Sequence, residues 1–417
     1  MGNTPNVRFK GFTEDWEQRK LSECAGFRRG SFPQPYGNKE WYDGEGAMPF
    51  VQVADVADDM KLVDDTKQKI SKLAQPMSVY ADKGSVLVTL QGSIGRVAIT
   101  QYGAFVDRTV LIFDKYNQDI DKTFWAYIIK EKFIDEARKA PGGTIKTITK
   151  EALSDFDLML PNYDEQKKLG AFLVSIDNLI TLQQQKCDET KEFKKYMLQN
   201  MFPQKDEKVP KIRFDGFTGD WEQRKLSEVA DKVTEKNSNF IVQETFTNSA
   251  EFGVISQRDF FDHDISNAEN IGGYYVVRDE DFVYNPRISV TAPVGPVNRN
   301  KLGRSGVMSP LYTVFRTHDI DTTYLEWFFK SSYWHPFMFF NGDSGARSDR
   351  FSIKDAVFFE MPIPLPSIDE QKEIGAYLDK IDNLITLHQQ KCNALKEFKK
   401  YMLQNMFPQK GKNKCQN

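Results

Sequence analysis

The sequence contains little of the chemistry on which most enzymes depend. Its 417 residues include four cysteines and four histidines, and none of them stands at a spacing typical of a metal site. Neither a GxxxxGK[ST] loop nor a GxGxxG pattern after a predicted strand is present, so no phosphate-binding loop for ATP or a dinucleotide is expected. The tripeptide NPR at 285–287 lacks the following proline and aromatic residue of an amino-methyltransferase motif. We therefore expect no catalytic residues and no metal site in this chain.

Long apolar runs are absent as well. No run approaches the roughly 18 residues that cross a bilayer, and the opening MGNTPNVRFKGF lacks the apolar centre of a signal peptide. Four cysteines without a disulfide-like pattern fit a reducing cytoplasm. The formal net charge of −3 argues weakly against a simple polybasic nucleic-acid binder.

What the sequence does contain is an internal repeat with a fixed shift of 205 residues. RFKGFTEDWEQRKLSE at 8–23 and RFDGFTGDWEQRKLSE at 213–228 agree at 14 of 16 positions, and 164–205 agrees with 369–410 at 33 of 42. Between these shared blocks, about 24–158 and 229–363 match only in scattered pieces. The shared parts therefore serve one purpose twice, whereas the variable parts perform two different tasks of one kind.

The long shared blocks have the spacing of amphipathic helices, with apolar residues three and four positions apart. Each predicted helix has about 38 residues, and Glu165 and Glu370 near its start are interpreted as capping residues. We expect the two helices to pack on each other as an antiparallel pair, although each could instead pack on its own domain. The residues assigned to the helix pair or to a partner are Leu169, Ile176, Ile180, Phe193, Met197, Met201, Ile374, Ile381, Ile385, Phe398, Met402 and Met406.

The variable regions predict two small α+β domains. Strands are expected at 84–90, 96–100, 109–114, 274–277, 281–285 and 311–315, and helices at 122–139 and 322–334. Parts of the variable regions are more basic than the net charge of the whole chain indicates, because residues 282–318 and 83–106 contain no Asp or Glu. Basic, glycine-rich loops with polar side chains suit contacts with phosphates and base edges, although an ordinary solvated surface has the same composition.

This combination resembles the specificity subunit of type I restriction–modification enzymes. The resemblance rests on two variable regions, each followed by an LPxxxEQ helix start at 160–166 and 365–371, on the near-identical long helices, and on the RFxGFxxDWEQRKLSE openings. It covers essentially the whole chain. It implies a non-catalytic subunit in which two target recognition domains, joined by two long antiparallel helices, each read half of a split DNA site.

The resemblance also implies partners and cofactors. Two modification subunits with S-adenosylmethionine would methylate adenine, and restriction subunits with ATP and Mg²⁺ would translocate and cut DNA. This chain itself would bind double-stranded DNA but no cofactor, and it would be cytoplasmic in a bacterium without contacting a membrane. The implied domains are 1–23, 24–160, 161–206, 207–228, 229–365 and 366–410, with a tail at 411–417.

Candidate DNA-contacting residues lie in the glycine-containing loops and the acid-free windows. In the first variable region they are Gln91, Ser93, Arg96, Arg108, Thr144 and Lys146. In the second they are Asn285, Arg287, Arg299, Arg304, Ser344, Arg347 and Arg350. Arg, Gln and Asn are the side chains suited to reading guanine and adenine, and many surface arginines contact only phosphate.

Three other functions stay open at the level of the sequence. The chain could be a helical adaptor with two protein-binding domains and no DNA affinity. It could be a nuclease or a methyltransferase without recognisable motifs, which would turn over substrate on its own. It could also serve a system that only methylates DNA, in which case its sequence would look the same.

Overall fold

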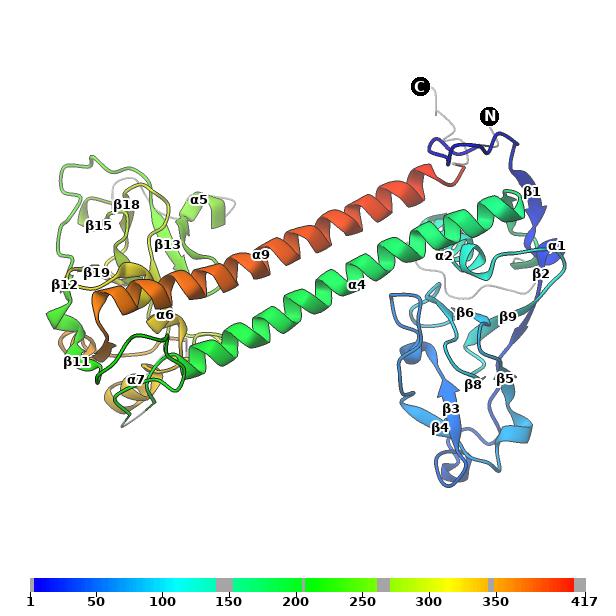
Figure 1. Cartoon of the computed structure of the whole chain (residues 1–417), viewed down its shortest axis with the longest axis horizontal. Coiled ribbons are helices and arrows are strands. Elements are labelled where there is room, and N and C mark those ends of the chain that lie inside the picture. The colour runs from blue at the N-terminus through cyan, green and yellow to red at the C-terminus, as the bar shows by residue number, and fades with distance from the viewer. Residues whose placement is uncertain (1–3, 140–152, 205–206, 261–270, 344–348, 409–417) are drawn as a thin grey trace. The chain divides into compact units, whose positions relative to one another are not determined.

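The computed structural model describes residues 4–139, 153–204, 207–260, 271–343 and 349–408. The chain forms two compact units: unit 1 comprises Met1–Gln184 and Gln390–Asn417, and unit 2 comprises Gln185–Gln389. Both unit boundaries fall inside long helices, α4 (Tyr163–Asn200) and α9 (Ile368–Asn405), each of 38 residues (Figure 1). The domain boundaries expected from the sequence stay predictions.

Unit 1 contains two four-stranded sheets and a two-stranded ribbon. The sheet orders are β2-β9-β6-β7 and β4-β3-β8-β5, and the ribbon pairs β1 with β10. The strands are β1 (Glu17–Lys20), β2 (Ala25–Arg29), β3 (Met48–Val51), β4 (Gln68–Ile70), β5 (Val79–Ala81), β6 (Val86–Thr89), β7 (Val97–Ile99), β8 (Ala104–Val106), β9 (Val110–Tyr116) and β10 (Asp157–Leu160). Among the described residues, the named α-helices of unit 1 besides the long ones are α1 (Leu21–Cys24) and α2 (Lys122–Lys139), and short 3-10 helices occur at Lys39–Trp41, Val53–Asp55 and Gln75–Met77.

Unit 2 repeats the principal sheet and the ribbon, with smaller pairs in place of the second sheet. Its sheet has the order β12-β19-β16-β17, its ribbon pairs β11 with β20, and β13-β14 and β15-β18 are two-stranded. The strands are β11 (Glu222–Lys225), β12 (Ala230–Lys232), β13 (Phe246–Ser249), β14 (Gly253–Ser256), β15 (Tyr275–Val277), β16 (Phe282–Tyr284), β17 (Val297–Arg299), β18 (Gly306–Met308), β19 (Thr313–Thr317) and β20 (Pro362–Leu365). The short helices are α5 (Gln257–Phe260), α6 (Thr322–Lys330), α7 (His335–Asn341) and α8 (Asp355–Phe358).

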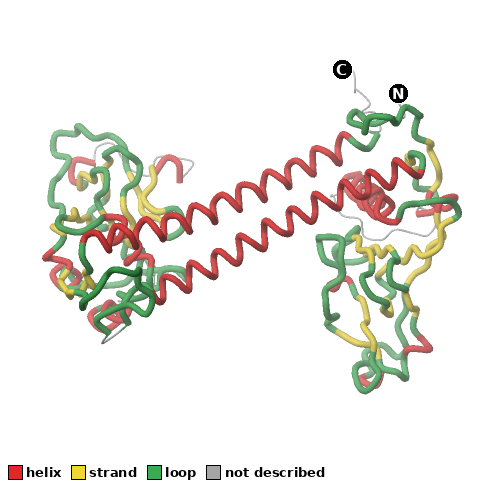
Figure 2. Tube along the Cα trace, viewed as in Figure 1, coloured by secondary structure: helices red, strands yellow, loops and turns green. Residues whose placement is uncertain are grey.

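Both units are therefore α+β domains, as the sequence predicts (Figure 2). The expected strands correspond to β6, β7, β9, β15, β16 and β19, and the helix expected at 122–139 corresponds to α2. The helix expected at 322–334 ends earlier, at Lys330, where Ser331 takes an extended backbone and its hydroxyl bonds the carbonyl of Phe328.

The start of each long helix is held by a side-chain junction that occurs twice, at positions 205 residues apart. Glu165 accepts two hydrogen bonds of 2.7 Å from Arg8, and Glu370 accepts bonds of 2.7 and 2.8 Å from Arg213. Both carboxylates are buried, so each depends on its arginine partner for charge compensation. The interpretation of Glu165 and Glu370 as capping residues is therefore wrong.

The capping groups themselves lie just before each helix. The side-chain oxygen of Asn162 accepts from the amide of Glu165, and that of Ser367 accepts from the amide of Glu370. Neither residue stood out in the sequence, because the two repeats use different side chains at this position.

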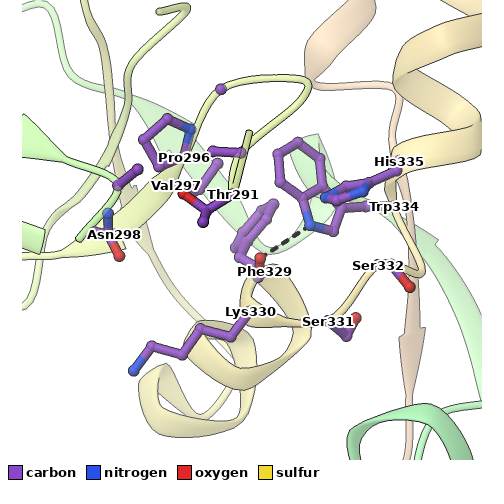
Figure 3. Close-up of a pocket in the computed structure, with 13 residues that line it drawn as sticks. Thr291, Pro296, Val297, Asn298, Phe329, Lys330, Ser331, Ser332, Trp334 and His335 are labelled. Carbon is purple, nitrogen blue, oxygen red and sulfur yellow. Dashed lines mark hydrogen bonds between the residues drawn. The ribbon is translucent and has the colours of Figure 1, made fainter. Parts of the chain in front are cut away.

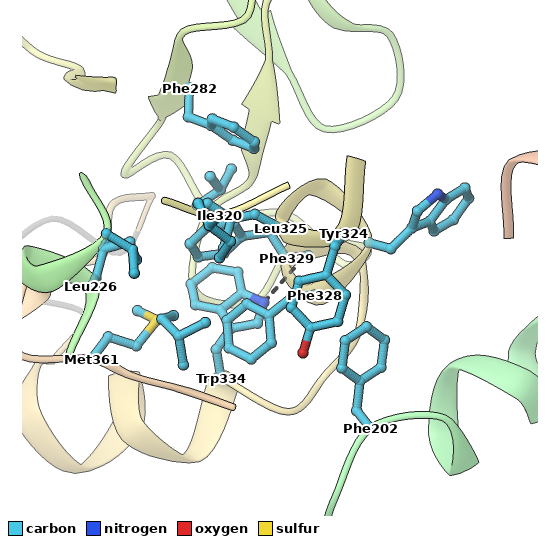
Figure 4. Packing of buried hydrophobic residues seen from close by; sticks show 14 of the residues in the cluster. Phe202, Leu226, Phe282, Ile320, Tyr324, Leu325, Phe328, Phe329, Trp334 and Met361 are labelled. Carbon is cyan, nitrogen blue, oxygen red and sulfur yellow. Dashed lines mark hydrogen bonds between the residues drawn. The ribbon is translucent and has the colours of Figure 1, made fainter. Parts of the chain in front are cut away.

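The end of each long helix belongs to the hydrophobic core of the unit in which the other long helix begins. In unit 1 the Phe407 ring stacks on Phe124 with centroids 5.9 Å apart and meets Trp16 edge-on at 6.0 Å. In unit 2 Phe202 lies 5.6 Å from the ring of Tyr324 and 6.1 Å from that of Phe328 (Figure 4). The repeated segment that ends in Met-Phe-Pro thus supplies a buried aromatic anchor to each unit.

The two long helices also contact each other inside each unit. In unit 1 the ammonium of Lys399 lies 2.6 Å from Asp177, and in unit 2 that of Lys194 lies 2.7 Å from Asp382. The thiol of Cys392 points to the carbonyl of Ile180 at 4.0 Å, and that of Cys187 to the carbonyl of Ile385 at 3.9 Å. In each unit, residue numbers increase along one helix while the numbers of their contact partners decrease along the other. The contacting helix halves therefore run antiparallel in each unit.

Most residues assigned to the helix pair lie in the cores. Leu169, Ile176, Met197, Met201, Ile374, Ile381 and Met406 are buried, and Ile180, Ile385 and Met402 are partly buried. Phe193 and Phe398, which occupy equivalent positions, are exposed instead. Phe398 still meets the ring of Phe172 edge-on with centroids 6.4 Å apart, so these two positions lie at the solvent-facing margin of the helices rather than in a core.

Replacing the helix-end anchor should loosen one unit selectively. We expect Phe202→Ala to destabilise unit 2 by about 3–5 kcal/mol, because a buried aromatic ring leaves a cavity between α4 and α6. Amide hydrogen exchange of α6 and thermal unfolding would measure the loss. The matched control is Phe340→Ala, whose ring is 89% exposed and whose removal should change stability by less than about 0.5 kcal/mol. Equal effects of the two variants would contradict the anchor role.

Candidate nucleic-acid interface

In unit 1, the principal sheet brings two of the predicted loops to one edge. Thr89 pairs with Val110 at the end of β6 and the start of β9, so the β6–β7 loop adjoins the short β8–β9 turn. The amide of Leu90 donates to the carbonyl of Thr109 at 2.8 Å. Gln91, Ser93 and Arg108 are exposed in these loops. We name this set of loops the unit 1 loop edge.

The unit 1 loop edge is held rigidly by polar contacts. Asp107 accepts from both the amide and the hydroxyl of Thr109, at 2.9 and 2.5 Å. The guanidinium of Arg108 lies 4.6 Å from the centroid of the Phe32 ring, a cation–π contact. A planar, oriented guanidinium of this kind is suited to base edges or phosphates.

The sequence reasoning missed Arg29, which lies at the end of β2 on the same edge. It is exposed and pairs with Leu111 of β9. The chain stays close to β8 here because Gly30 has no side chain: a Cβ atom would lie 2.2 Å from the carbonyl oxygen of Val106. In the sequence, a glycine directly after two arginines was the pattern that could have indicated Arg29 as a candidate.

Arg96, by contrast, is engaged inside the domain. Its Nε lies 3.1 Å from Asp58, and its Nη1 lies 3.4 Å from the carbonyl oxygen of Val56. It immediately precedes β7 beside the loop edge, and its side chain is paired with the exposed carboxylate of Asp58.

In unit 2, the equivalent edge carries the β16–β17 loop and the β18–β19 loop. Tyr284 pairs with Thr313, which brings 285–296 beside 309–312. Arg287 and Arg350 face each other in an antiparallel bridge, so the structure unites two predicted residues 63 positions apart. The Arg287 side chain is 71% exposed and lies 3.8 Å from the carboxylate of Asp349. We name this set of loops the unit 2 loop edge.

Asn285 stabilises the unit 2 loop edge through two side-chain hydrogen bonds. Its Nδ2 donates to the carbonyl of Asn248 at 2.7 Å, and its Oδ1 accepts from the amide of Arg287 at 3.0 Å. Both polar ends of the amide therefore hold the loop, and we assign Asn285 a positioning role.

The prediction that Arg299 contacts DNA is wrong. Only 7% of its side chain is exposed, and it donates two hydrogen bonds to Glu326 at 2.9 and 2.7 Å and one to Glu280 at 2.7 Å. Burial raises the pKa of Glu326, but Lys330 and Arg299 outweigh this effect and hold the pKa below its usual value. Arg299 therefore neutralises a buried carboxylate inside unit 2.

Arg304 lies at the opposite end of the sheet. The turn that contains it is anchored where the amide of Asn300 donates to the carbonyl of Asp281, at the start of β16. Its guanidinium donates two hydrogen bonds to the carboxylate of Glu244, at 2.7 and 2.8 Å, and these bonds lower the pKa of Glu244. The structure thus separates Arg304 from Arg287 and Arg350. Thr144, Lys146, Ser344 and Arg347 lie outside the described residues.

A cavity of about 240 Å³ lies behind the β16–β17 loop (Figure 3). It is lined by Thr291 and Asn298 on one side and by Lys330, Trp334 and His335 on the other. Burial lowers the pKa of His335, so the imidazole is neutral at pH 7.

In the part of the chain that the structure describes, no group of three or more His, Cys, Asp or Glu side chains could hold a metal ion. Across the same residues, no helix combines the length and the apolar character that a membrane span requires.

A model of the type I restriction modification DNA specificity domain matches the sequence twice, at residues 13–192 and 218–397. The two matched ranges are offset by the 205 positions of the internal repeat and together include most of the chain. The protein belongs to this family of type I restriction–modification specificity subunits, as its sequence motifs indicate.

Individual relatives agree with this assignment. The chain is 22% identical over 407 residues to the type I restriction enzyme MjaVIII specificity subunit of Methanocaldococcus jannaschii, with 94% of this chain and 91% of the relative covered. It resembles in fold the type I restriction–modification S subunit of M. genitalium, with a TM-score of 0.58, 12% identity, and 98% and 100% of the two chains covered. A chain from work on the assembly and conformational transition of the type I system gives a TM-score of 0.53 at 17% identity, covering 93% and 96%. At these identities the structures support the fold alone.

Two exposed arginines of unit 2, Arg287 and Arg304, should respond differently to truncation. We expect Arg287→Ala to weaken DNA binding about tenfold, because an exposed guanidinium at the loop edge is lost. Arg304→Ala is the matched control, an exposed arginine at the other end of the sheet, and it should leave the affinity unchanged. Fluorescence anisotropy at fixed salt measures both.

Arg299→Ala should instead destabilise unit 2 by about 1.5–3 kcal/mol, because the buried carboxylate of Glu326 loses two charge-assisted hydrogen bonds and keeps only Lys330 and Lys301 as cationic partners. Thermal unfolding would detect this loss. A stable Arg299→Ala variant with weakened DNA binding would contradict the buried structural role.

Proposed function

We propose that this chain is the DNA-reading, non-catalytic subunit of a type I restriction–modification complex, and that its two variable domains each read half of a split site. The observation that carries the proposal is the double family match over two domains whose loop edges differ. Unit 1 presents Arg108 against Phe32, whereas unit 2 presents Arg287 beside Arg350. Two domains with different loop edges, built on the same repeated strands and long helices, suit an asymmetric DNA site with two different halves.

In this proposal, α4 and α9 set the distance between the half-sites. A helix of 38 residues is about 57 Å long at 1.5 Å per residue, long enough to separate two domains by more than one turn of DNA. The antiparallel contacts of the helix halves in each unit support this role, because they give the repeated segments a fixed register.

The long helices would also bind the partner subunits. Leu179, Leu182, Phe193 and Tyr196 of α4 are exposed, at spacings of three and eleven that keep them on one helix face. Their equivalents on α9, namely Leu384, Leu387, Phe398 and Tyr401, are exposed as well. We name these two sets the exposed helix faces. Two like apolar surfaces fit two copies of one partner, the modification subunit.

The chemistry would belong to the partners. Modification subunits would carry S-adenosylmethionine and methylate adenine, while restriction subunits, where a system has them, would use ATP and Mg²⁺. The chain would act in the cytoplasm, and its contribution would be to choose the DNA sequence. A system that only methylates DNA would use it in the same way.

The methylation pattern of genomic DNA tests the proposed reading role. We expect cells that make this chain with its modification subunit to methylate adenines in one split motif, and cells without the chain to lose that methylation. Sequencing that detects N6-methyladenine would read out the motif and its spacer. An unchanged pattern, with the chain expressed and assembled, would refute the proposal and favour an adaptor that does not bind DNA.

Charge placed on the exposed helix faces tests the docking role. Leu179 and Leu384 are each 48% exposed, so aspartate at either position should leave the fold intact. We expect Leu179→Asp or Leu384→Asp to remove one modification subunit from the complex and the double variant to remove both, as mass photometry would show. Val209→Asp, at a partly exposed position outside the helices, is the control. Full assembly of the double variant would exclude this surface.

A further inference from the structure

The β16–β17 loop of unit 2 ends in a protruding tip, Ser289-Val290-Thr291. Val290 has a relative exposure of 102%, the highest among the exposed large hydrophobic side chains of the described residues. A single exposed valine is ordinary on a protein surface. Whether Val290 has a function therefore has to be judged from the hydrogen bonds and the neighbouring side chains of its loop.

The tip is fixed by backbone hydrogen bonds from both sides. The amide of Ile288 donates to the carbonyl of Asp349 at 3.0 Å, and the amide of Ser289 donates to the carbonyl of Ala292 at 3.0 Å. The hydroxyl of Tyr284 donates to the carbonyl of Val294 at 2.9 Å. These bonds tie both flanks of the tip to β16 and to the segment beside Arg350, and the side chain of Val290 between them is exposed.

Gly295 closes the loop in a way that only glycine allows. Its φ is +84°, and an added Cβ atom would lie 2.2 Å from the carbonyl oxygen of Asn285. The tip is therefore a preorganised projection, and its exposed valine loses little conformational entropy on binding.

The surroundings of Val290 favour a nucleic-acid groove as its environment. Ser289 and Thr291, which flank it in the sequence, have hydroxyls that are hydrogen-bonded to each other at 3.2 Å, and the exposed guanidinium of Arg287 is three residues away. The sequence from 282 to 318 contains no acidic residue. One small apolar group among hydroxyls and a cation is too small for a protein hot spot, which requires a large buried anchor. It suits the major groove, where the only apolar group on a base edge is the thymine C5-methyl.

We propose that Val290 reads a thymine by contacting its 5-methyl group in the major groove of one half-site, with Arg287 directed to the adjacent guanine or phosphate. This inference rests on the proposed function and adds to it the chemical feature that unit 2 recognises.

Replacing thymine by deoxyuridine removes only that methyl group and therefore isolates the contact. The assembled complex with its modification subunits would be titrated with duplexes carrying the motif from the methylation map, each thymine in turn replaced by deoxyuridine. We expect one position at which the substitution weakens binding about three- to fivefold, as loss of one buried methyl contact predicts.

Variants of Val290 show whether that sensitivity belongs to this side chain. In Val290→Ser the deoxyuridine effect at that position should disappear, whereas Val290→Thr, which keeps one methyl group, should retain part of it. Leu73→Ser, an exposed apolar residue of unit 1, should retain all of it. Because Val290 is fully exposed, unchanged thermal unfolding of its variants is expected.

The outcomes separate this inference from the function on which it rests. A split motif without thymine, or equal affinity for every deoxyuridine duplex, would overturn the reading by Val290 and leave the DNA-reading role intact. A deoxyuridine effect that persists in Val290→Ser would assign the methyl contact elsewhere and overturn it as well. A methylation map without any split motif would instead remove the proposed function.

Discussion

The aromatic anchor at the end of each long helix is the contact on which the rest of this structure depends. Phe407 stacks on Phe124 in unit 1, and Phe202 packs against Tyr324 in unit 2. Each helix begins in one unit and contributes its end to the core of the other. Each hydrophobic core therefore includes an aromatic residue from the end of the long helix that begins in the other unit.

This arrangement explains which residues a variable domain has to keep. In each unit one helix, α2 or α6, contacts the start of a long helix. An aspartate, Asp121 or Asp321, precedes that helix, and its side chain accepts a hydrogen bond from the backbone amide three residues later. The amide of the same aspartate donates to Gln166 or Gln371 of the LPxxxEQ motif. A capping aspartate and an aromatic ring three residues on are thus common to both units where this helix meets the start of the long helix. The loop edges are then free to differ, because they make none of these contacts.

The sequence predicts the elements better than it predicts the use of individual side chains. The three-and-four spacing predicts both long helices because that spacing reflects one local period, and the strands follow from short apolar runs. Glu165 was misread because its partner, Arg8, is 157 residues away, and Arg299 was misread because Glu326 reaches it only through the fold of unit 2. Phe193 and Phe398 fit the apolar period but lie on its uncovered side, which periodicity alone cannot separate from the core side. Gln91, Ser93 and Arg108 were predicted as candidates because they flank a glycine loop between expected strands, whereas Arg29 is brought beside them by the tertiary pairing of β2 with β9.

The two loop edges illustrate how one frame can serve two chemistries. At the unit 1 edge, Arg108 is oriented by the Phe32 ring, so a rigid hydrogen-bond donor is presented. At the unit 2 edge, the hydrogen-bonded tip presents a methyl-bearing valine next to Arg287. A guanidinium recognises paired acceptors such as those of guanine, whereas a valine recognises an apolar group and gains nothing from an acceptor. Both edges are built on the same strand order and lie at the same end of the principal sheet. The loop edges differ between the units and make none of the contacts of the aromatic anchors, the buried ion pairs or the glutamines of the helix starts, so loop residues can change without disturbing those contacts.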